Sequence, residues 1–394
     1  MSITVVNPQV QHSYQVAVAL IEGGLLENYV TSFFFRPDQI SYLPHFLRQE
    51  FAKRFHPQIP TDKVVTFPYI ELAWKLAGKL VTPALHERLF YYNVWGFDAL
   101  MARRVAKSPG HIVVGYENSC RETFKAAKKT GKYCVLDAAS IHYLSQKEVY
   151  RPPYSERFLA RINAVKEEEI NLADHILALS NYAKESYIQA GVPGKKITVI
   201  PLGIDIDKFT KHKKEKKGDY FTYLFAGNLK LSKGVDILLD AFSKVEVPNK
   251  RLTIIGAMGD AAPLLKKRLS KVIVKKHMPQ EKLLEEYHDA DIFVLPSRLD
   301  GFGFVVAEAM STATPVIVSS HVGAKDLVED DINGWVFESG NSDALTAAMQ
   351  KAFDDRNNLG LMGGNARKTV SRYTWETYRE NIRNFYSGLL DHLK

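Results

Sequence analysis

The alternation of short β-branched runs with helical segments is the feature that most constrains the fold of this 394-residue chain. Such runs occur at residues 3–6, 111–115, 133–136, 175–180 and 197–201, and again at 220–225, 252–256, 291–295 and 315–318. Buried strands that alternate with helices predict an open parallel sheet with helices on both faces. A polar, lysine-rich stretch, Lys208 to Asp219, separates the two series, so we expect two α/β domains.

The domain boundaries follow from this interruption. We predict a first Rossmann-like domain over residues 1–203, a linker over 204–218 and a second domain over 219–374. A last helix over 375–394 is expected to pack back across the junction. We interpret the run Lys211–Lys217 within the linker as a solvated connection, with contact to an anionic surface as the alternative.

Composition limits the class of protein. Hydrophobic residues make up 46% and charged residues 24%, which excludes a disordered or fibrous chain. The net charge of +8 favours acidic partners, but it is diffuse and no nucleic-acid-binding motif occurs. With only Cys120 and Cys134, no signal-peptide pattern and no apolar run that could span a membrane, we expect a cytoplasmic protein, with peripheral attachment to a membrane as an option.

A glycine-containing loop follows the strand expected at 292–295. It carries Asp300, Gly301 and Gly303, and it leads into a helix that begins near Phe302 to Phe304. Glycines let the backbone approach a ligand, and the free N–H groups of a first helical turn bind anions. The segment therefore predicts a phosphate site. Glu308 lies eight positions after Asp300. Taken alone, these two acids are more simply explained as surface residues with no shared function.

A second strand, glycine turn and helix occurs at residues 225–234. Lys230 and Lys233 stand in this turn and could reach a diphosphate as point charges. The Walker A spacing is absent, and neither half of the chain has a GxGxxG fingerprint. Kinase, ATPase and dehydrogenase functions are therefore disfavoured.

These motifs together resemble those of the family 4 glycosyltransferases, which have the GT-B fold, use nucleotide sugars and retain anomeric configuration. The resemblance is strongest from about Glu169 to Tyr386. It includes the segments 173–180, 199–205, 227–234, 278–281, 290–297 and 333–334. It implies two Rossmann-like parallel-sheet domains that face a central cleft, the first for the acceptor and the second for the donor.

The resemblance also implies a donor site. Glu308 matches the acid that binds the ribose, Asp300 the acid near the donor sugar, and Lys233 the lysine on the diphosphate. Asp300 stands where the family normally has Glu. Asn228 stands where the family commonly has Arg, and we hypothesise that Lys230 replaces this missing basic side chain. The other implied donor-binding positions are Gly227, His277, Met278, Gly301, Phe302, Gly303, Phe304 and Val305.

In the first domain, His142 resembles the histidine that touches the donor sugar, so the resemblance implies catalytic roles for His142, Asp300 and Lys233. The usual glycine-rich turn after the first strand is replaced by residues 7–13, which leaves His12 and Gln15 as weak acceptor-side candidates. We interpret Asp205-Ile206-Asp207 as structural, and no metal ion is implied. The aromatic and basic region over residues 33–104 could contact a membrane or a substrate.

The implied reaction moves a sugar from a UDP- or GDP-sugar to a hydroxyl of a glycan or glycolipid acceptor, in cell-surface polysaccharide biosynthesis. No cofactor is implied beyond the donor substrate. A front-face displacement, in which the leaving phosphate helps to deprotonate the acceptor, is the implied route to retention. Two alternatives remain open: a non-catalytic sugar-nucleotide-binding or assembly subunit, and a GT-B phosphorylase or epimerase. An anionic membrane surface is a further expected partner.

Overall fold

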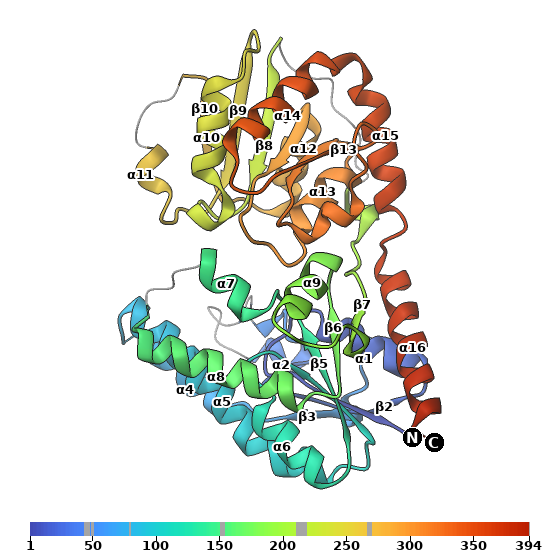
Figure 1. Cartoon of the computed structure of the whole chain (residues 1–394). Helices are drawn as coiled ribbons and strands as arrows, with labels where there is room; N and C mark the ends of the chain where they lie inside the picture. Colours follow the sequence, from blue (N-terminus) through green and yellow to red (C-terminus); the bar gives the residue numbers. More distant parts are fainter. Residues whose placement is uncertain are drawn as a thin grey trace.

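The computed structural model describes residues 1–42, 48, 51–78, 80–149, 154–209, 219–265 and 270–393. The lysine run 211–217 and residues 43–47 and 49–50 of the aromatic and basic region lie outside the described residues. Figure 1 shows two α/β units, one above the other, and we call them the first and the second domain.

The first domain is built on a parallel seven-stranded sheet with the order β3-β2-β1-β4-β5-β6-β7. Its strands are β1 (Ile3–Val6), β2 (Leu26–Thr31), β3 (Val64–Thr66), β4 (Ile112–Tyr116), β5 (Tyr133–Ala138), β6 (His175–Ala178) and β7 (Ile197–Val199). Its helices include α1 (Ser13–Glu22), α2 (Pro37–Ile40), α4 (Tyr69–Ala77), α5 (Pro83–Lys107), α6 (Arg121–Lys129), α7 (Tyr143–Val149), α8 (Glu156–Leu172) and α9 (Asn181–Gln189).

The second domain is built on a parallel six-stranded sheet with the order β10-β9-β8-β11-β12-β13. Its strands are β8 (Phe221–Ala226), β9 (Lys250–Gly256), β10 (Val272–Lys276), β11 (Ile292–Leu295), β12 (Val316–Ser319) and β13 (Gly334–Phe337). Its helices include α10 (Val235–Lys244), α11 (Ala262–Leu265), α12 (Gln280–Asp289), α13 (Phe304–Ser311), α14 (Ser342–Asp354) and α15 (Leu359–Val370). Two parallel-sheet domains confirm the predicted fold class.

The last helix, α16 (Trp375–His392), packs against the first domain (Figure 1). Its side chains Tyr378, Ile382 and Tyr386 are buried in the same apolar cluster as residues of α1 and of β1. An ion pair of 3.0 Å joins Arg379 Nε on α16 to Glu22 Oε1 on α1. The chain therefore returns to the first domain after completing the second.

The two crossings between the domains lie side by side. The N–H of Ile204, on the way out, donates a hydrogen bond of 2.8 Å to the carbonyl of Tyr373, on the way back. A Cβ added to Gly203 would lie 2.5 Å from the Cα of Trp375, so only glycine allows the two segments to pack this closely. The junction is thus a paired connection of two segments.

None of the helices in the described ranges is long and apolar enough to cross a membrane.

Candidate active site

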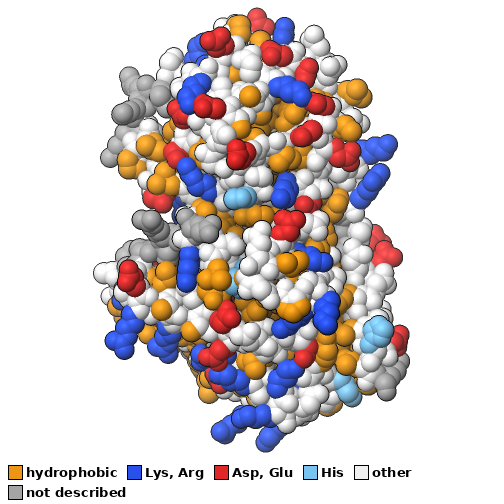
Figure 2. Space-filling view, in the orientation of Figure 1, with side chains coloured by type: hydrophobic (Ala, Val, Ile, Leu, Met, Phe, Trp, Pro, Cys, Tyr) orange, Lys and Arg blue, Asp and Glu red, His pale blue; other side chains and the backbone are white. Residues whose placement is uncertain are grey.

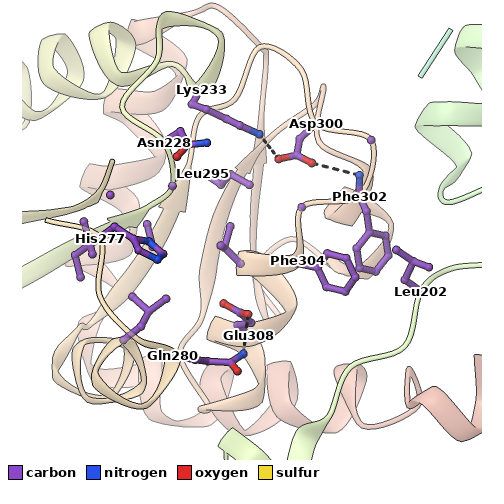
Figure 3. Close-up of a pocket in the computed structure, with 18 of the residues that line it drawn as sticks. Leu202, Asn228, Lys233, His277, Gln280, Leu295, Asp300, Phe302, Phe304 and Glu308 are labelled. Carbon is purple, nitrogen blue, oxygen red and sulfur yellow. Dashed lines mark hydrogen bonds and ion pairs between the residues drawn. The ribbon is translucent and has the colours of Figure 1, made fainter. Parts of the chain in front are cut away.

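A cleft of about 880 Å³ lies between the two domains. Figure 2 shows the two domains meeting across a waist in the middle of the molecule, and Figure 3 shows residues around the cleft, most of the labelled ones from the second domain. The second domain contributes the loops at the carboxyl ends of β8, β9, β10 and β11 and the first turns of α13. In an open parallel sheet, this edge is where ligands bind.

Close backbone packing shapes the second-domain side of the cleft. Gly234 takes a left-handed φ of +70°, and a Cβ there would overlap the carbonyl of Pro296. A Cβ on Gly256 would likewise overlap the carbonyl of Gly227. Arg298, just after β11, donates two hydrogen bonds of 2.7 Å to the carboxylate of Asp236 on α10. These contacts hold the segment after β8 against the end of β9 and against the loop after β11.

Lys233 and Asp300 meet in this cleft (Figure 3). Lys233 Nζ lies 2.6 Å from Asp300 Oδ2, and Asp300 Oδ1 accepts a hydrogen bond of 3.3 Å from the N–H of Phe302. The backbone of Asp300 is held as well: its N–H donates to the carbonyl of His321 and its carbonyl accepts from the N–H of Gly323. The structure thus presents one cation and one anion, already paired, at the edge of the cleft.

The helix α13 begins inside the cleft. Its N-terminal cap is Gly303, with a left-handed φ of +88° and no side chain that could cap the first turn. Phe304 and Val305, the first two helical residues, line the cleft. Free N–H groups and the positive end of the helix dipole at this place suit a phosphate group.

Glu308 lies one turn further along α13. Its Oε2 accepts a hydrogen bond of 3.0 Å from the hydroxyl of Tyr287, and its Oε1 accepts one of 3.2 Å from Nε2 of Gln280 (Figure 3). Burial raises the pKa of the Glu308 carboxyl, and the two hydrogen bonds offset part of that rise. The carboxyl is positioned to accept hydrogen bonds from a ligand that carries hydroxyl groups.

Most of the donor-binding residues expected from the sequence line this one cleft. They are Gly227, Asn228, Lys233, His277, Met278, Asp300, Gly301, Phe302, Gly303, Phe304, Val305 and Glu308. Lys230 does not line it. The structure therefore gives no geometric support to Lys230 as the substitute for a basic side chain at Asn228.

His142 also does not line the cleft. It is 2% exposed, its N–H donates a hydrogen bond of 2.9 Å to Ser186 Oγ, and its ring packs edge-on against Tyr187. Burial lowers the pKa of the imidazole. The structure thus places His142 behind the wall of the cleft, so a contact with the donor sugar would require this loop to move.

The first domain instead brings Gln11 and His12 into the cleft. Gln11 has a φ of +35°, a left-handed conformation in the position of the missing glycine-rich turn. The sequence offered His12 only as a weak acceptor-side candidate, and it gave no signal for Gln11. Gln15 points elsewhere, where its Oε1 accepts a hydrogen bond of 3.0 Å from Arg379.

The aspartates of the Asp-Ile-Asp segment do not line the cleft. Asp205 pairs with Lys208 at 2.7 Å in the junction between the domains. Within the described residues, no three His, Cys, Asp or Glu side chains gather closely enough to hold a metal ion.

A polar contact between the domains involves the loop after β11. Ser180 Oγ, before α9, donates a hydrogen bond of 2.8 Å to the carbonyl of Gly301, the residue after Asp300. The N–H of Asn181 donates to Asp326 Oδ2 at 2.7 Å, and burial raises the pKa of that carboxyl. The start of α9 thus holds the loop that carries Asp300.

Two parallel-sheet domains that face each other across a cleft define the class of protein as one with the GT-B fold. Two family models match the chain: "Glycosyltransferase Family 4" over residues 77–208 and "Glycosyl transferases group 1" over residues 207–369. The chain belongs to the glycosyltransferases of the family 4 type.

Curated relatives match part of the chain. An uncharacterised glycosyltransferase of Methanocaldococcus jannaschii is 31% identical over 172 residues, which cover 41% of this chain and 44% of that protein. The D-inositol 3-phosphate glycosyltransferase of Xylanimonas cellulosilytica is 26% identical over 246 residues, which cover 56% of this chain and 58% of that protein. The matched part thus spans about half the length of these relatives.

Solved structures match the whole fold. Sucrose-phosphate synthase of Thermosynechococcus elongatus has a TM-score of 0.69 at 18% identity, with 100% of both chains covered. The Anabaena protein HepE, solved in complex with UDP-glucose, has a TM-score of 0.62 at 17% identity, with 98% of this chain and 100% of that chain covered. At these identities the likeness is one of fold.

Proposed function

We propose that this protein is a glycosyltransferase that moves a sugar from a nucleotide-diphosphate sugar to a hydroxyl group of a glycan or glycolipid acceptor. The observation that carries the proposal is the arrangement of Lys233, Asp300 and Glu308 around one cleft. Lys233 would bind a phosphate near the N-terminus of α13, and Glu308, one turn further along, would accept hydrogen bonds from the ribose hydroxyls.

The departure of the nucleoside diphosphate requires charge stabilisation on the phosphate that leaves. Lys233 and the first-turn N–H groups at Phe304 and Val305 would supply it from fixed positions. Removing one preorganised donor of this kind typically costs about 3 to 4 kcal/mol of transition-state stabilisation. The closed contact between Ser180 and Gly301 would keep water away from the sugar while the acceptor is aligned.

The donor is proposed to be a UDP- or GDP-sugar. HepE, which has the same fold, was solved with UDP-glucose, and a 26% identical relative from Mycolicibacterium smegmatis is named a GDP-mannose-dependent mannosyltransferase. A thermal-shift screen of UDP, GDP, ADP and their sugars would test the proposal. Stabilisation by UDP or GDP that is lost in Glu308→Ala supports it, and no stabilisation by any nucleotide overturns it.

The catalytic part of the proposal needs a second test. Release of nucleotide from the stabilising donor is measured with and without a crude glycan or glycolipid fraction. We expect release that depends on the acceptor and falls in Lys233→Ala. Tight binding without release would instead indicate the non-catalytic subunit.

Retention of anomeric configuration is proposed on the basis of the family. The test is proton NMR of the first product formed from an α-linked donor. An α-linked product supports retention, and a β-linked product overturns it. A role in polysaccharide synthesis is proposed from relatives named for capsular polysaccharide and amylovoran biosynthesis, at 26% and 29% identity.

We also propose that the first domain contacts an anionic membrane surface. On and after α4, the side chains of Tyr69, Leu76 and Leu80 are exposed, and α5 exposes Arg103 and Arg104. Apolar and basic side chains on helices favour the interface of a bilayer. Sedimentation with vesicles of anionic lipid at low salt tests the proposal, and an absence of binding overturns it.

A further inference from the structure

The loop between β1 and α1 (residues 7–13) is held from behind by a buried arginine. Nη1 of Arg54 donates a hydrogen bond of 3.0 Å to the carbonyl of Pro8, and Nη2 donates one of 3.4 Å to Oε1 of Gln9. Arg54 is 7% exposed, although an arginine is seldom buried unless it is paired. Its guanidinium therefore fixes the first half of the β1–α1 loop.

A buried carboxylate fixes the direction of this guanidinium. Nη2 of Arg54 also donates to Oε1 of Glu71 on α4, and Glu71 is 0% exposed. Nζ of Lys75, one turn further along α4, lies 3.5 Å from the same oxygen. Charge-assisted hydrogen bonds are strong, and the planar fork of an arginine makes them directional. Arg54 therefore has little freedom to turn away from the loop.

The second half of the β1–α1 loop enters the cleft. Gln11 and His12 both line the cleft, and Gln11 is an exposed residue. Its φ of +35° is a left-handed conformation that costs a glutamine free energy, so it persists only where neighbouring contacts impose it. Nε2 of His12 lies 2.9 Å from Oδ1 of Asp137. Gln11 thus stands between two fixed points of the loop, one held by Arg54 and the other by Asp137.

Stability alone gives little reason for an ion pair behind this loop. A buried pair can often be replaced by apolar side chains of similar volume without loss of stability, because burying two charges costs about as much free energy as their attraction returns. Nε2 of Gln9 is also buried without a hydrogen-bond partner among the described residues, which adds to the cost. The hydrogen bonds to Pro8 and Gln9 are what the guanidinium supplies and an apolar side chain could not.

We propose that Gln11 binds the acceptor in the cleft and that Arg54, fixed by Glu71, is the positioning residue that holds Gln11 there. This inference rests on the proposed function, in which the second domain binds the donor from the opposite side of the cleft. The side-chain amide of a glutamine both donates and accepts hydrogen bonds, which suits a hydroxyl group of a sugar. Gln11 orients that hydroxyl group and takes no proton from it, so the leaving phosphate can still deprotonate the acceptor.

The test compares two fates of the donor in the full-length protein. UDP-glucose, or GDP-mannose if UDP does not bind, is supplied together with the crude glycan or glycolipid fraction, and sugar transfer is measured. Hydrolysis of the same donor by water and the affinity for the nucleotide are measured without that fraction. A residue that serves the acceptor alone changes transfer, whereas damage to the donor site changes all three quantities.

Arg54→Met combined with Glu71→Leu tests the positioning role. Replacing both charges avoids the unpaired buried carboxylate that Arg54→Met alone would leave, so we expect a melting temperature close to that of the wild type. The loop loses its two bonds to the guanidinium, and transfer should fall about 10- to 100-fold, because a misplacement of about 1 Å can cost 100-fold. Hydrolysis and nucleotide affinity should not change. Normal transfer in this double variant would show that the pair is only structural, which would overturn the inference.

Gln11→Ala tests the contact itself and leaves the buried pair intact, so it decides the question even if the double variant does not fold. Alanine keeps the left-handed strain at this position, and only the amide is lost. We expect the apparent KM for the acceptor fraction to rise about 3- to 10-fold, the usual effect of one lost hydrogen bond, with hydrolysis unchanged. Gln189→Ala, at the end of α9 and outside the cleft, is the matched control and should change neither rate. An unchanged KM in Gln11→Ala contradicts the inference.

Failure of the proposed function would give a different result. If the wild-type protein binds neither nucleotide, or transfers no sugar to the fraction, the proposed function fails and takes this inference with it. If the wild type transfers sugar and the variants at Gln11 and Arg54 match it, the inference alone is wrong. Equal losses of transfer and hydrolysis in the double variant would also count against it, because the effect would then not be confined to the acceptor.

Discussion

The ammonium group of Lys233 and the carboxylate of Asp300 form an ion pair of 2.6 Å at the edge of the cleft where a diphosphate is proposed to bind. The two side chains are 27% and 20% exposed, so the pair is accessible to a ligand. An incoming diphosphate must share Lys233 with Asp300 or displace the carboxylate from it. The ion pair thus opposes the binding of a free nucleoside diphosphate.

Removing the charge of Asp300 should strengthen the binding of free UDP. In Asp300→Asn the competing anion is lost, and we expect UDP to bind about fivefold more tightly, equivalent to about 1 kcal/mol, by isothermal titration calorimetry. Lys233→Ala is the matched opposite change and should weaken binding. Weaker binding in Asp300→Asn would show that Asp300 organises the site instead of competing for Lys233.

Glu308 should make nucleotide binding sensitive to pH. Because burial raises the pKa of this carboxyl, it becomes neutral at a higher pH than an ordinary glutamate and then loses its charge-assisted hydrogen bonds. We expect Glu308→Gln to weaken UDP binding about 10- to 100-fold at pH 8, the usual range for a hydrogen bond to a charged group. The difference between the two proteins should shrink as the pH is lowered. A constant difference would contradict the role of the ionised carboxylate.

Gly323 should control how closely the domains approach. A Cβ there would overlap the carbonyl of Gly301 and Ser180 Oγ, the two ends of the contact between the domains. Gly323→Ala should therefore lower the free energy of unfolding, measured in urea, by about 1 to 3 kcal/mol. It should also slow the release of UDP from the sugar donor. Gly388→Ala, within α16 with no neighbouring atom within 4 Å, is the control and should stabilise by about 0.5 to 1 kcal/mol. Equal effects of the two substitutions would rule out a steric role.

Glu169 should make the protein less stable as the pH rises. Burial raises the pKa of its carboxyl from 4.5 to about 8, while its oxygens accept from the N–H groups of Asn118 and Cys120. The native state therefore keeps a proton that the unfolded chain has released, so this contribution is present below pH 4.5 and is lost as the pH rises through 8.

The measurement is urea unfolding of the wild type and of Glu169→Gln at several pH values between 4.5 and 8. The neutral amide should flatten the decline of the free energy of unfolding with pH. Parallel curves for the two proteins would show that Glu169 does not cause the decline.

Local sequence patterns predicted the two parallel-sheet domains and the glycine-containing loop after β11, whereas most of the expected donor-binding residues were implied by the resemblance to the family. The loop after β11 was predicted from its glycines because glycine is the residue that tolerates the left-handed backbone seen at Gly303. Four strands, β2, β3, β10 and β13, were not identified. Of these, β3 has only three residues, and β2 and β10 mix polar with apolar residues, so their hydrophobic patterns are weak.

The contacts that join distant segments could not be predicted in the same way. His12 and Asp137 are 125 positions apart, and Ser180 and Gly301 are 121 apart, so only the folded chain shows that they meet. A partial signal existed for Asp137, which lies at the carboxyl end of a parallel strand, where binding residues gather. His142 follows the same strand, but it is buried and does not line the cleft.

The return of α16 to the first domain also sets the order in which the protein can fold during synthesis. Tyr378, Ile382 and Tyr386 fill the core of the first domain, yet the ribosome makes them after the whole second domain. The first domain begins to fold before the second, but its core is complete only after α16 has been made. Until then, the apolar face of α1 that α16 covers is exposed to the cell, so the nascent chain offers chaperones a binding surface that the finished protein lacks.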